Sequence, residues 1–147
     1  MEKSGTILSP DANKALLRRM VEEVLNRKNL EVIPDLVAEN YIDHNAVAGQ
    51  PSGIKAFVEA RIKRNAAFPD WHVTLDQVIA EGDKVVARAT GRGTHLGLFM
   101  GIAPTGKSVI TTWTVIYRIS GAKLAEHWIN SHDLGLLRQL GKVPHLE

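Results

Sequence analysis

The chain has 147 residues, of which 44% are hydrophobic and 23% are charged, a composition typical of a soluble globular protein. The net charge of +2 is too small to imply nucleic-acid binding, which normally shows a concentrated basic stripe, and no run approaches the ~20 apolar residues of a membrane span. The absence of cysteine excludes disulfides, thiolate catalysis and cysteine-based metal sites. We therefore expect a single cytoplasmic domain over residues 1–147, with its core at 11–141 and with no membrane or nucleic-acid partner.

Two helices are predicted in the first part of the chain. Ser9-Pro10-Asp11 is typical of a helix start, with a serine cap, a proline in the first turn and an acid near the positive end of the helix dipole. This helix should end near Asn26–Asn29, and Leu30–Val37 should form a short second helix that Pro34 limits. Tyr41–Asn45 is expected to be extended. Apolar residues at helical spacing predict the buried stripe of the first helix: Leu17, Met20, Val21, Val24 and Leu25.

A third helix is predicted over Gly53–Ala67, before the stop signal Phe68-Pro69-Asp70. Its expected buried residues are Ile54, Phe57, Val58 and Ile62. The same segment carries the dense basic cluster of the chain, formed by Arg61, Lys63 and Arg64. Because clustered charges usually lie on a solvated helix face, we interpret these residues as facing solvent.

The remainder of the chain predicts four antiparallel strands and a short helical tail at Leu134–Leu140. Glu81–Lys84 should form the first hairpin turn, and the long strand Ser108–Ser120 should place alternate side chains on opposite faces. Helices followed by strands predict an α+β fold, in which the helices cover one face of a curved sheet and enclose a cavity. The expected strands are a first one opened by Trp71, Val73 and Leu75, then Val85–His95, Ser108–Ser120 and Leu124–Asn130.

The segment Gly93–Lys107 joins two of these strands and is too long for a tight hairpin. It is also apolar, although most surface loops are polar. We therefore expect its apolar side chains to be buried and the loop to cover the mouth of a small-molecule pocket. These side chains are Leu96, Leu98, Phe99, Met100 and Ile102.

Short segments spread from about Asp11 to Gly141 occur in a characteristic order and spacing: Asn40–Asn45, Phe68–Asp70, Glu81–Val86, Gly93–Gly97, Pro104–Lys107, Glu126–Trp128 and Asp133–Gly141. Together they resemble the SnoaL-like polyketide cyclases, or ester cyclases, of the NTF2-like superfamily. The resemblance implies an α+β cone with a pocket between the concave sheet and the helices. It also implies a homodimer or homotetramer formed through the sheet, and ring closure by intramolecular aldol condensation without metal or cofactor.

The resemblance further implies where polar catalytic residues should lie. In these cyclases an aspartate follows the histidine of the final strand by two positions, which in this chain leads from His127 to Ile129. A pocket histidine of the family falls at Val115. Both positions are apolar here, and a slip of one residue gives Asn130, which is not a base either. The resemblance therefore supports the family's fold for this chain better than it supports the family's activity.

Proton transfer requires a group with a pKa near neutrality within reach of the substrate, and six side chains are candidates: His44, His95, His127, His132, Asp43 and Asp133. His127 shares strand parity with Ile129, on the face assigned to the cavity. His44 should lie at the rim of the cone, where Asp43 or Asn45 could orient its ring. His95 begins the apolar loop, and Asp133 follows the last strand. The alternatives are a core histidine for His127, a loop anchor for His95 and a helix cap for Asp133.

Aromatic and apolar residues are expected to line the substrate site. Trp113 and Tyr117 lie on one strand face and could stack on a planar substrate, or else serve only as packing. Trp128, on the other face, would suit a dimer interface formed by the sheet. The histidines lack ligand spacing on any one element, so no metal site is expected. The further expected substrate contacts are Val115, Ile129, Phe99 and Phe57.

Three functions are compatible with these observations. The first is a cofactor-free cyclase, isomerase or lyase acting on a polyketide-like or cyclic carbonyl compound. The second is a protein that binds a small apolar or aromatic ligand without reacting with it, and the third is a dimeric interaction domain. At least two of His44, His95, His127 and Asp133 should face one pocket if the enzyme hypothesis is right.

Overall fold

A computed structural model describes residues 8–46, 48–50 and 52–143. No helix in these ranges is long and apolar enough to cross a membrane. In chain order, the elements are α1 (Pro10–Met20), the π-helical segment η1 (Val21–Asn26), the 3₁₀ turn η2 (Leu30–Val32), α2 (Ile33–Leu36), β1 (Val37–Asp43), α3 (Gly53–Ala67), β2 (His72–Glu81), β3 (Lys84–Thr94), β4 (Ser108–Ser120), β5 (Lys123–Ser131) and α4 (Asp133–Gln139).

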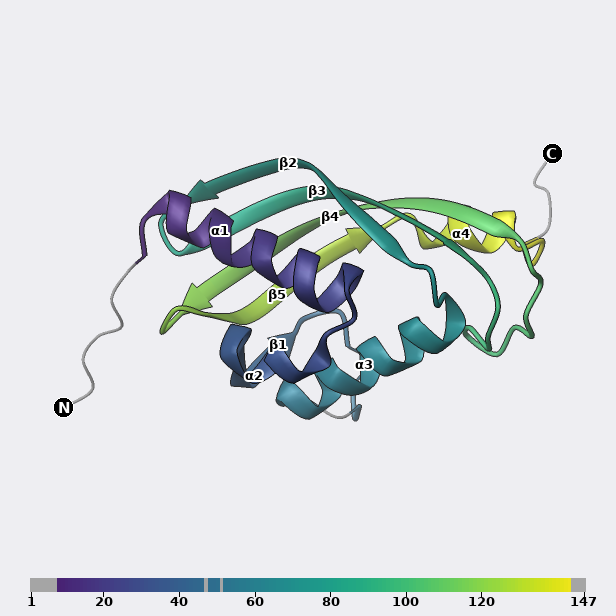
Figure 1. Cartoon of the computed structure of the whole chain (residues 1–147), viewed down its shortest axis with the longest axis horizontal. Helices are drawn as coiled ribbons and strands as arrows, with labels where there is room; N and C mark the ends of the chain where they lie inside the picture. The colour runs from purple at the N-terminus through teal and green to yellow at the C-terminus, as the bar shows by residue number, and fades with distance from the viewer. Residues whose placement is uncertain (1–7, 47, 51, 144–147) are drawn as a thin grey trace.

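The strands form one curved sheet in the order β1-β5-β4-β3-β2. The pairs from β2 to β5 are antiparallel, whereas β1 runs parallel to β5. Figure 1 shows α1 and α3 on the hollow side of this sheet, with α4 near one end. The predicted α+β architecture is confirmed, but the prediction of four antiparallel strands is corrected to five strands in a mixed sheet.

The fifth strand, β1, confirms the predicted extended backbone over Tyr41–Asp43 and begins one residue inside a predicted helix. We expected a helix over Leu30–Val37, but helical structure there ends at Leu36 and β1 begins at Val37. Pro34 lies in the first turn of α2. Backbone N–H groups in a first turn have no partner within the helix, so a proline there removes no helical hydrogen bond. Val37 and Tyr41 of β1 are buried, at 1% and 2% exposure. This segment therefore adds an edge strand that carries side chains into the interior.

The two long helices follow their sequence signals closely. The Ser9 hydroxyl accepts a hydrogen bond from the backbone N–H of Ala12 at 3.1 Å, and Pro10 opens α1 as predicted. The bounds of α3 are those predicted, and Phe57 is half-buried. Ile62, however, is 52% exposed, so the prediction that it is buried is wrong. The helix turns Phe57, Arg61 and Arg64 toward the sheet instead.

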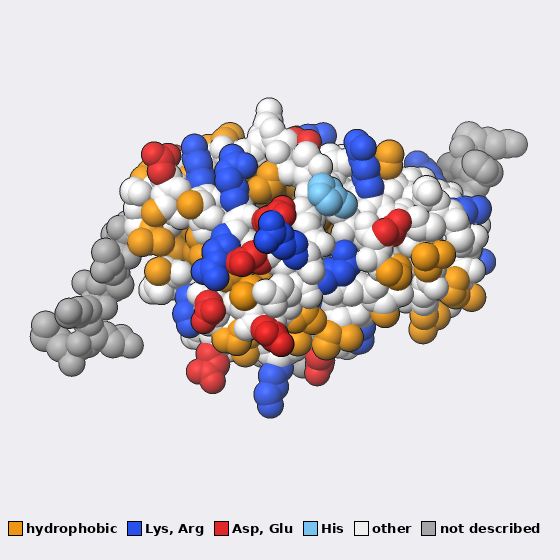
Figure 2. Space-filling model, in the orientation of Figure 1, with side chains coloured by type: hydrophobic (Ala, Val, Ile, Leu, Met, Phe, Trp, Pro, Cys, Tyr) orange, Lys and Arg blue, Asp and Glu red, His pale blue; other side chains and the backbone are white. Residues whose placement is uncertain are grey.

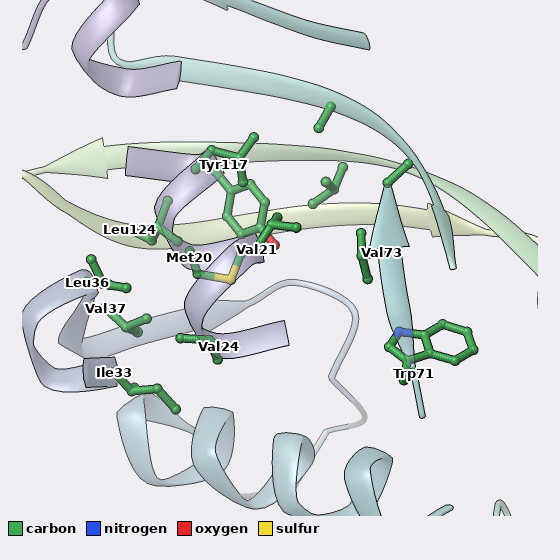
Figure 3. Close-up of a cluster of buried hydrophobic side chains, with 14 of the residues drawn as sticks. Met20, Val21, Val24, Ile33, Leu36, Val37, Trp71, Val73, Tyr117 and Leu124 are labelled. Atoms are coloured by element: carbon green, nitrogen blue, oxygen red, sulfur yellow. The ribbon is translucent and has the colours of Figure 1, made fainter. Parts of the chain in front are cut away.

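The core lies between the helices and the concave face of the sheet. Strand β4 alternates as predicted, with Val109, Thr111, Val115, Tyr117 and Ile119 buried on the inner face. Figure 3 shows side chains from η1, α2 and β1 packed together at one end of this core and Trp71 at some distance from them. Because the packing is dense at one end, the wider part of the interior can hold a cavity.

Candidate functional site

A cavity of about 410 Å³ lies between α3 and the inner face of the sheet. This volume is within the range of small-molecule sites. Its walls come from β1, α3, β4, β5 and the start of α4. The side chains that line it include Tyr41, Asp43, Phe57, Arg61, Arg64, Trp71, Trp113, Tyr117, His127, Ile129 and Asp133.

His127 is the centre of a hydrogen-bonded group in this cavity. Its Nδ1 is hydrogen-bonded to the hydroxyl of Tyr41, and its Nε2 lies 3.0 Å from Oδ1 of Asp43. The parallel pairing of β1 with β5 places Asp43 directly opposite His127 in register. Tyr41, two residues earlier on β1, points to the same side of the strand. A pairing between residues far apart in sequence therefore assembles the Tyr41–His127–Asp43 group.

The chemistry of the partners decides which ring nitrogen carries the proton. An ionised carboxylate only accepts hydrogen bonds, so Nε2 of His127 must donate to Asp43. In the neutral imidazole, Nδ1 is then the acceptor and the Tyr41 hydroxyl donates to it. Asp43 Oδ1 also accepts a hydrogen bond from the backbone N–H of Asn45 at 2.8 Å. Hydrogen bonds are thus donated along the group from Tyr41 to Asp43.

Burial favours the uncharged forms of the two ring side chains. It lowers the pKa of His127, an effect that Asp43 opposes and that Arg61 and His44 reinforce. The pKa of Tyr41 is raised far above its ordinary value by burial first and then by Tyr117 and Asp43. His127 is therefore neutral at neutral pH, and Tyr41 keeps its proton. The Asp43 side chain, 44% exposed, is the charged end of the group.

Two arginines of α3 also line the cavity, which contradicts the expectation that they face solvent. Arg61 and Arg64 are half-buried, and only Lys63 of the predicted cluster is exposed. Burial lowers the pKa of Arg61, while Tyr117, Tyr41 and Asp43 raise it. Burial and the charge of Arg61 lower the pKa of Arg64 to about 10, against the opposite effect of Asp133. Because arginine is effectively always protonated in proteins, both guanidinium groups are charged.

An aromatic wall closes the other end of the cavity. Trp71 and Trp113 stack with ring centroids 6.3 Å apart and an interplanar angle of 15°. The guanidinium carbon of Arg64 lies 5.5 Å from the Trp71 ring. Space for the stack comes from Gly91, because a Cβ there would lie 2.2 Å from Trp71 Cζ2. A planar ligand would therefore meet an aromatic surface that is already ordered.

Several predicted site residues do line this cavity. Of the candidates for proton transfer, His127, Asp43 and Asp133 line it. The enzyme hypothesis required at least two such groups to face one pocket, and this condition is met. Asp133 is the first residue of α4 rather than its cap, which is His132. The predicted substrate contacts that line the cavity are Trp113, Tyr117, Ile129 and Phe57.

His95 does not line the cavity. Its ring is fully buried, and Nδ1 is 3.0 Å from Oγ1 of Thr105 and 3.2 Å from the backbone nitrogen of Thr105. Nε2 has no hydrogen-bond partner in the described part of the chain. The structure therefore gives His95 the alternative role considered above, which is to anchor the loop that follows β3.

His44 lies outside the cavity as well. Its ring stacks on Trp128 at a centroid distance of 4.5 Å, and Nε2 lies 2.6 Å from Oε2 of Glu126. Asp43, which we considered as a partner that orients His44, binds His127 instead. Adjacent residues of a strand point to opposite faces, so β1 sends Asp43 inward and His44 toward the outer face. Val115 is buried in the core at 3% exposure without lining the cavity.

The apolar loop between β3 and β4 is not a lid over this cavity. Leu96, Leu98 and Met100 are 56%, 68% and 69% exposed, which contradicts the expectation of burial. Phe99 and Ile102 pack against the core, but neither they nor any other residue of the loop line the cavity. Figure 2 shows hydrophobic side chains gathered at the end of the molecule where this loop lies.

Sequence analysis missed Tyr41, Arg61, Arg64 and Trp71 as residues of the site. The arginines were detectable in principle, because Phe57, Ala60, Arg61 and Arg64 recur at helical spacing on one face of α3. Tyr41 gave no local signal, since its partner lies 86 residues later. Within residues 8–46, 48–50 and 52–143, no group of three or more histidine or carboxylate side chains could hold a metal ion.

Comparisons with known proteins agree on one family. The model of the SnoaL-like polyketide cyclases matches residues 15–140. TsrD from Streptomyces laurentii is 27% identical, with a TM-score of 0.85 over 92% of this chain and 99% of its own. AclR from Streptomyces galilaeus, a candidate hydroxylase, is 31% identical, with a TM-score of 0.80 over 95% of this chain and 91% of its own.

A third similar structure is IdmH from Streptomyces antibioticus, a candidate polyketide cyclase. It is 28% identical, with a TM-score of 0.75 over 88% of this chain and 98% of its own. No curated protein sequence matches the chain. The family model and the shared α+β cone lead to the same conclusion: the chain belongs to the SnoaL-like polyketide cyclase family, with an NTF2-like fold.

Proposed function

We propose that the cavity binds a small, mostly apolar carbonyl compound and that Asp43, held by His127, removes a proton from the carbon next to the carbonyl. The observation that carries the proposal is the carboxylate of Asp43, which lines the cavity 3.0 Å from Nε2 of His127. A cyclase-type reaction begins with such a proton transfer. The family places its aspartate where this chain has Ile129, and β1 supplies a carboxylate to the same cavity.

The hydrogen bonds around Asp43 leave it one free oxygen. Oδ1 is bound by His127 and Asn45, and Oδ2 has no partner among the described residues. In the proposed step the C–H bond breaks and its proton bonds to Oδ2. The electron pair remains on the substrate as an enolate, whose carbon can attack a second carbonyl of the same molecule. The protonated Asp43 then returns its proton to the new alkoxide, so the step needs no co-reactant.

His127 and Tyr41 support this step by position rather than by direct contact. Tyr41 donates to Nδ1 and so fixes the tautomer in which Nε2 carries the proton. The Nε2–H group then orients the carboxylate of Asp43. Protonation of His127 would add a cation beside Asp43 and make that carboxylate a weaker base. Because burial lowers the pKa of His127, we expect the rate to fall only at pH values below the ordinary histidine pKa of about 6.5.

Hydrogen–deuterium exchange tests the proposal even while the natural substrate is unidentified. A panel of cyclic ketones, such as 2-tetralone and 1-indanone, is incubated with the protein in D₂O, and exchange next to the carbonyl is followed by NMR. We expect Asp43→Asn to slow protein-dependent exchange by about 10²-fold or more, the contribution typical of a general base. Asp35→Asn, a matched change at an exposed carboxylate of α2, should have no effect.

Two outcomes would contradict this assignment. Exchange that survives Asp43→Asn but is lost in Asp133→Asn would identify the other carboxylate at the cavity as the base. Binding of the ketones without any exchange would favour the second candidate function, a protein that holds an apolar ligand without reacting with it. The presence of Ile129 in the cavity wall, at the position of the family's aspartate, is the observation in favour of that candidate.

We also propose that the outer face of the sheet forms a homodimer. Trp128 and His44 stack on this face, and Ile110 of β4 is 52% exposed there. Apolar side chains on an exposed sheet face favour association. Light scattering coupled to gel filtration should give a dimer, and Ile110→Lys should shift the mass toward the monomer. A monomeric unmodified protein would contradict this proposal.

A further inference from the structure

Arg61 is a cation inside the cavity without a partner. No hydrogen bond or ion pair joins its guanidinium to any side chain in the part of the chain that the structure describes. The group has five N–H donors in a planar fork, and the half-buried side chain lines the cavity. A charge that has lost part of its water is stabilised by an anionic partner. An unpaired arginine in a binding cavity therefore calls for a ligand that supplies the missing acceptor.

The carboxylates at the cavity do not fill this role. Asp43 is bound to His127 and Asn45, and both Asp43 and Asp133 are exposed side chains rather than interior ones. Neither forms an ion pair with Arg61 or Arg64 in the described ranges. The negative groups thus lie toward solvent and the positive groups lie along α3. The interior is cationic although the residues that line it carry equal numbers of both charges.

Arg64 has partners of another kind. Its guanidinium carbon lies 5.5 Å from the ring centre of Trp71 and 5.2 Å from that of Phe99, so it stacks on aromatic faces. It also lies close enough to Arg61 to be repelled by it. A ligand anion on Arg61 would relieve this repulsion. Neither arginine forms a hydrogen bond among the described residues, but Arg64 is held between two rings, so Arg61 is the guanidinium that can turn toward a single anionic group of a ligand.

We propose that Arg61 is an anion-binding residue and that the ligand is an aromatic or polyketide-type compound with a carboxylate. A carboxylate matches the planar fork of a guanidinium with two parallel hydrogen bonds. Phe57, Trp113 and Tyr117 supply the flat walls for a ring system attached to it. This inference rests on the proposed function and deepens it, because a carboxylate fixed on Arg61 determines which carbon of the ligand faces Asp43.

Two compounds of the same shape and different charge test the inference. The probes are 2-naphthoate and the neutral 2-naphthamide, and their affinities are measured by isothermal titration calorimetry. We expect the unmodified protein to bind 2-naphthoate at least about tenfold more tightly, the gain typical of a charge-assisted hydrogen bond. Arg61→Met should abolish this preference while leaving 2-naphthamide affinity within about threefold. Lys63→Met removes a charge from the exposed side of the same helix and should leave the preference intact.

Equal binding of the two probes by the unmodified protein, or binding of neither, overturns the inference. So does a preference that persists in Arg61→Met or is lost equally in Lys63→Met. If Arg61→Met does not fold, as judged by circular dichroism, Arg61→Gln replaces it with the same expectations. The proposed function can fail independently of this inference. Arg61-dependent naphthoate binding without ketone exchange would contradict the proposed reaction and support the anion site. Ketone exchange without a naphthoate preference would support the reaction and contradict the anion site.

Discussion

Replacing Asp43 by asparagine tests the central contact of the site, because the change keeps the shape of the side chain and removes its charge. Burial lowers the pKa of His127, whereas Asp43 raises it through a contact of 3.0 Å. Asparagine can still accept a hydrogen bond from Nε2 but stabilises the imidazolium far less. We therefore expect the pKa of His127 to fall further in Asp43→Asn.

The size of this effect follows from the exposure of the pair. Two unit charges 3.0 Å apart interact by about 1.4 kcal/mol in bulk water and by several times more in a protein interior. The Asp43 side chain is 44% exposed and that of His127 is 15% exposed, so solvent screening keeps the gain close to the bulk-water value of about 1.4 kcal/mol. Since one pH unit corresponds to about 1.4 kcal/mol, the pKa of His127 should fall by about 1 pH unit.

An NMR titration measures this pKa directly from the ring Cε1–Hε1 signals. The chain has six histidines, and the spectrum of His127→Gln identifies the signal of His127 by its disappearance. Asp133→Asn provides the control, because Asp133 lines the same cavity and forms no ion pair with His127 in the described ranges. An unchanged or raised pKa of His127 in Asp43→Asn would refute the reasoning, since the carboxylate would then not face the ring in solution.

Four further changes test the same structure. The pKa of His127 is lower in the folded protein than in the unfolded chain, where it is about 6.5. The unfolded chain therefore binds a proton first, and the folded state should lose stability as the pH falls below about 6.5. Thermal melting between pH 8 and pH 5 should show a smaller loss in His127→Gln. Tyr41→Phe leaves buried Nδ1 of His127 without its donor, so urea unfolding should show a cost of about 1–3 kcal/mol, whereas an unchanged midpoint would mean that this bond is absent. Arg61→Met removes a desolvated charge and should stabilise the ligand-free protein by about 1 kcal/mol, a rise of about 3 °C in Tm; a fall of that size would reveal an internal partner. Gly91→Ala places a methyl 2.2 Å from Trp71 and 2.8 Å from Trp113, so it should change the near-ultraviolet circular dichroism and cost about 1–3 kcal/mol, and an unaltered spectrum would contradict the close approach.

Local sequence signals predicted most of the fold. The bounds of α3 and of β4 were predicted to the residue, and the turn at Glu81–Lys84 pairs its two ends as expected. Their sequence signals are local: capping residues, alternation of apolar and polar side chains, and turn residues, all within a few positions of one another. Strand β1 was predicted only as an extended segment at Tyr41–Asn45, because its partner, β5, lies some eighty residues later and only that pairing makes it a strand of the sheet.

The errors at the site have a common physical cause: the hydropathy of a residue does not state which surface it will face. Arg61 and Arg64 were assigned to solvent because they are charged, yet a cavity is also an aqueous surface and can hold charges. Leu98 and Met100 were assigned to the interior because they are apolar, yet both are more than half exposed. For the two arginines, helical spacing predicts the position better than charge does. They lie on the same face of α3 as Phe57 and Ala60, and residues at helical spacing point in the same direction.

The Tyr41–His127–Asp43 group shows how a carboxylate can enter the cavity from a strand other than β5. Ile129 lies in the cavity wall, two residues after His127 on β5, and cannot exchange protons. The adjacent parallel strand β1 places Asp43 opposite His127, and the carboxylate reaches the ring from there. Neighbouring strands present side chains to the same space, so either can supply a given group. The apolar residue at position 129 therefore does not decide whether this cavity transfers protons, and the behaviour of Asp43→Asn does.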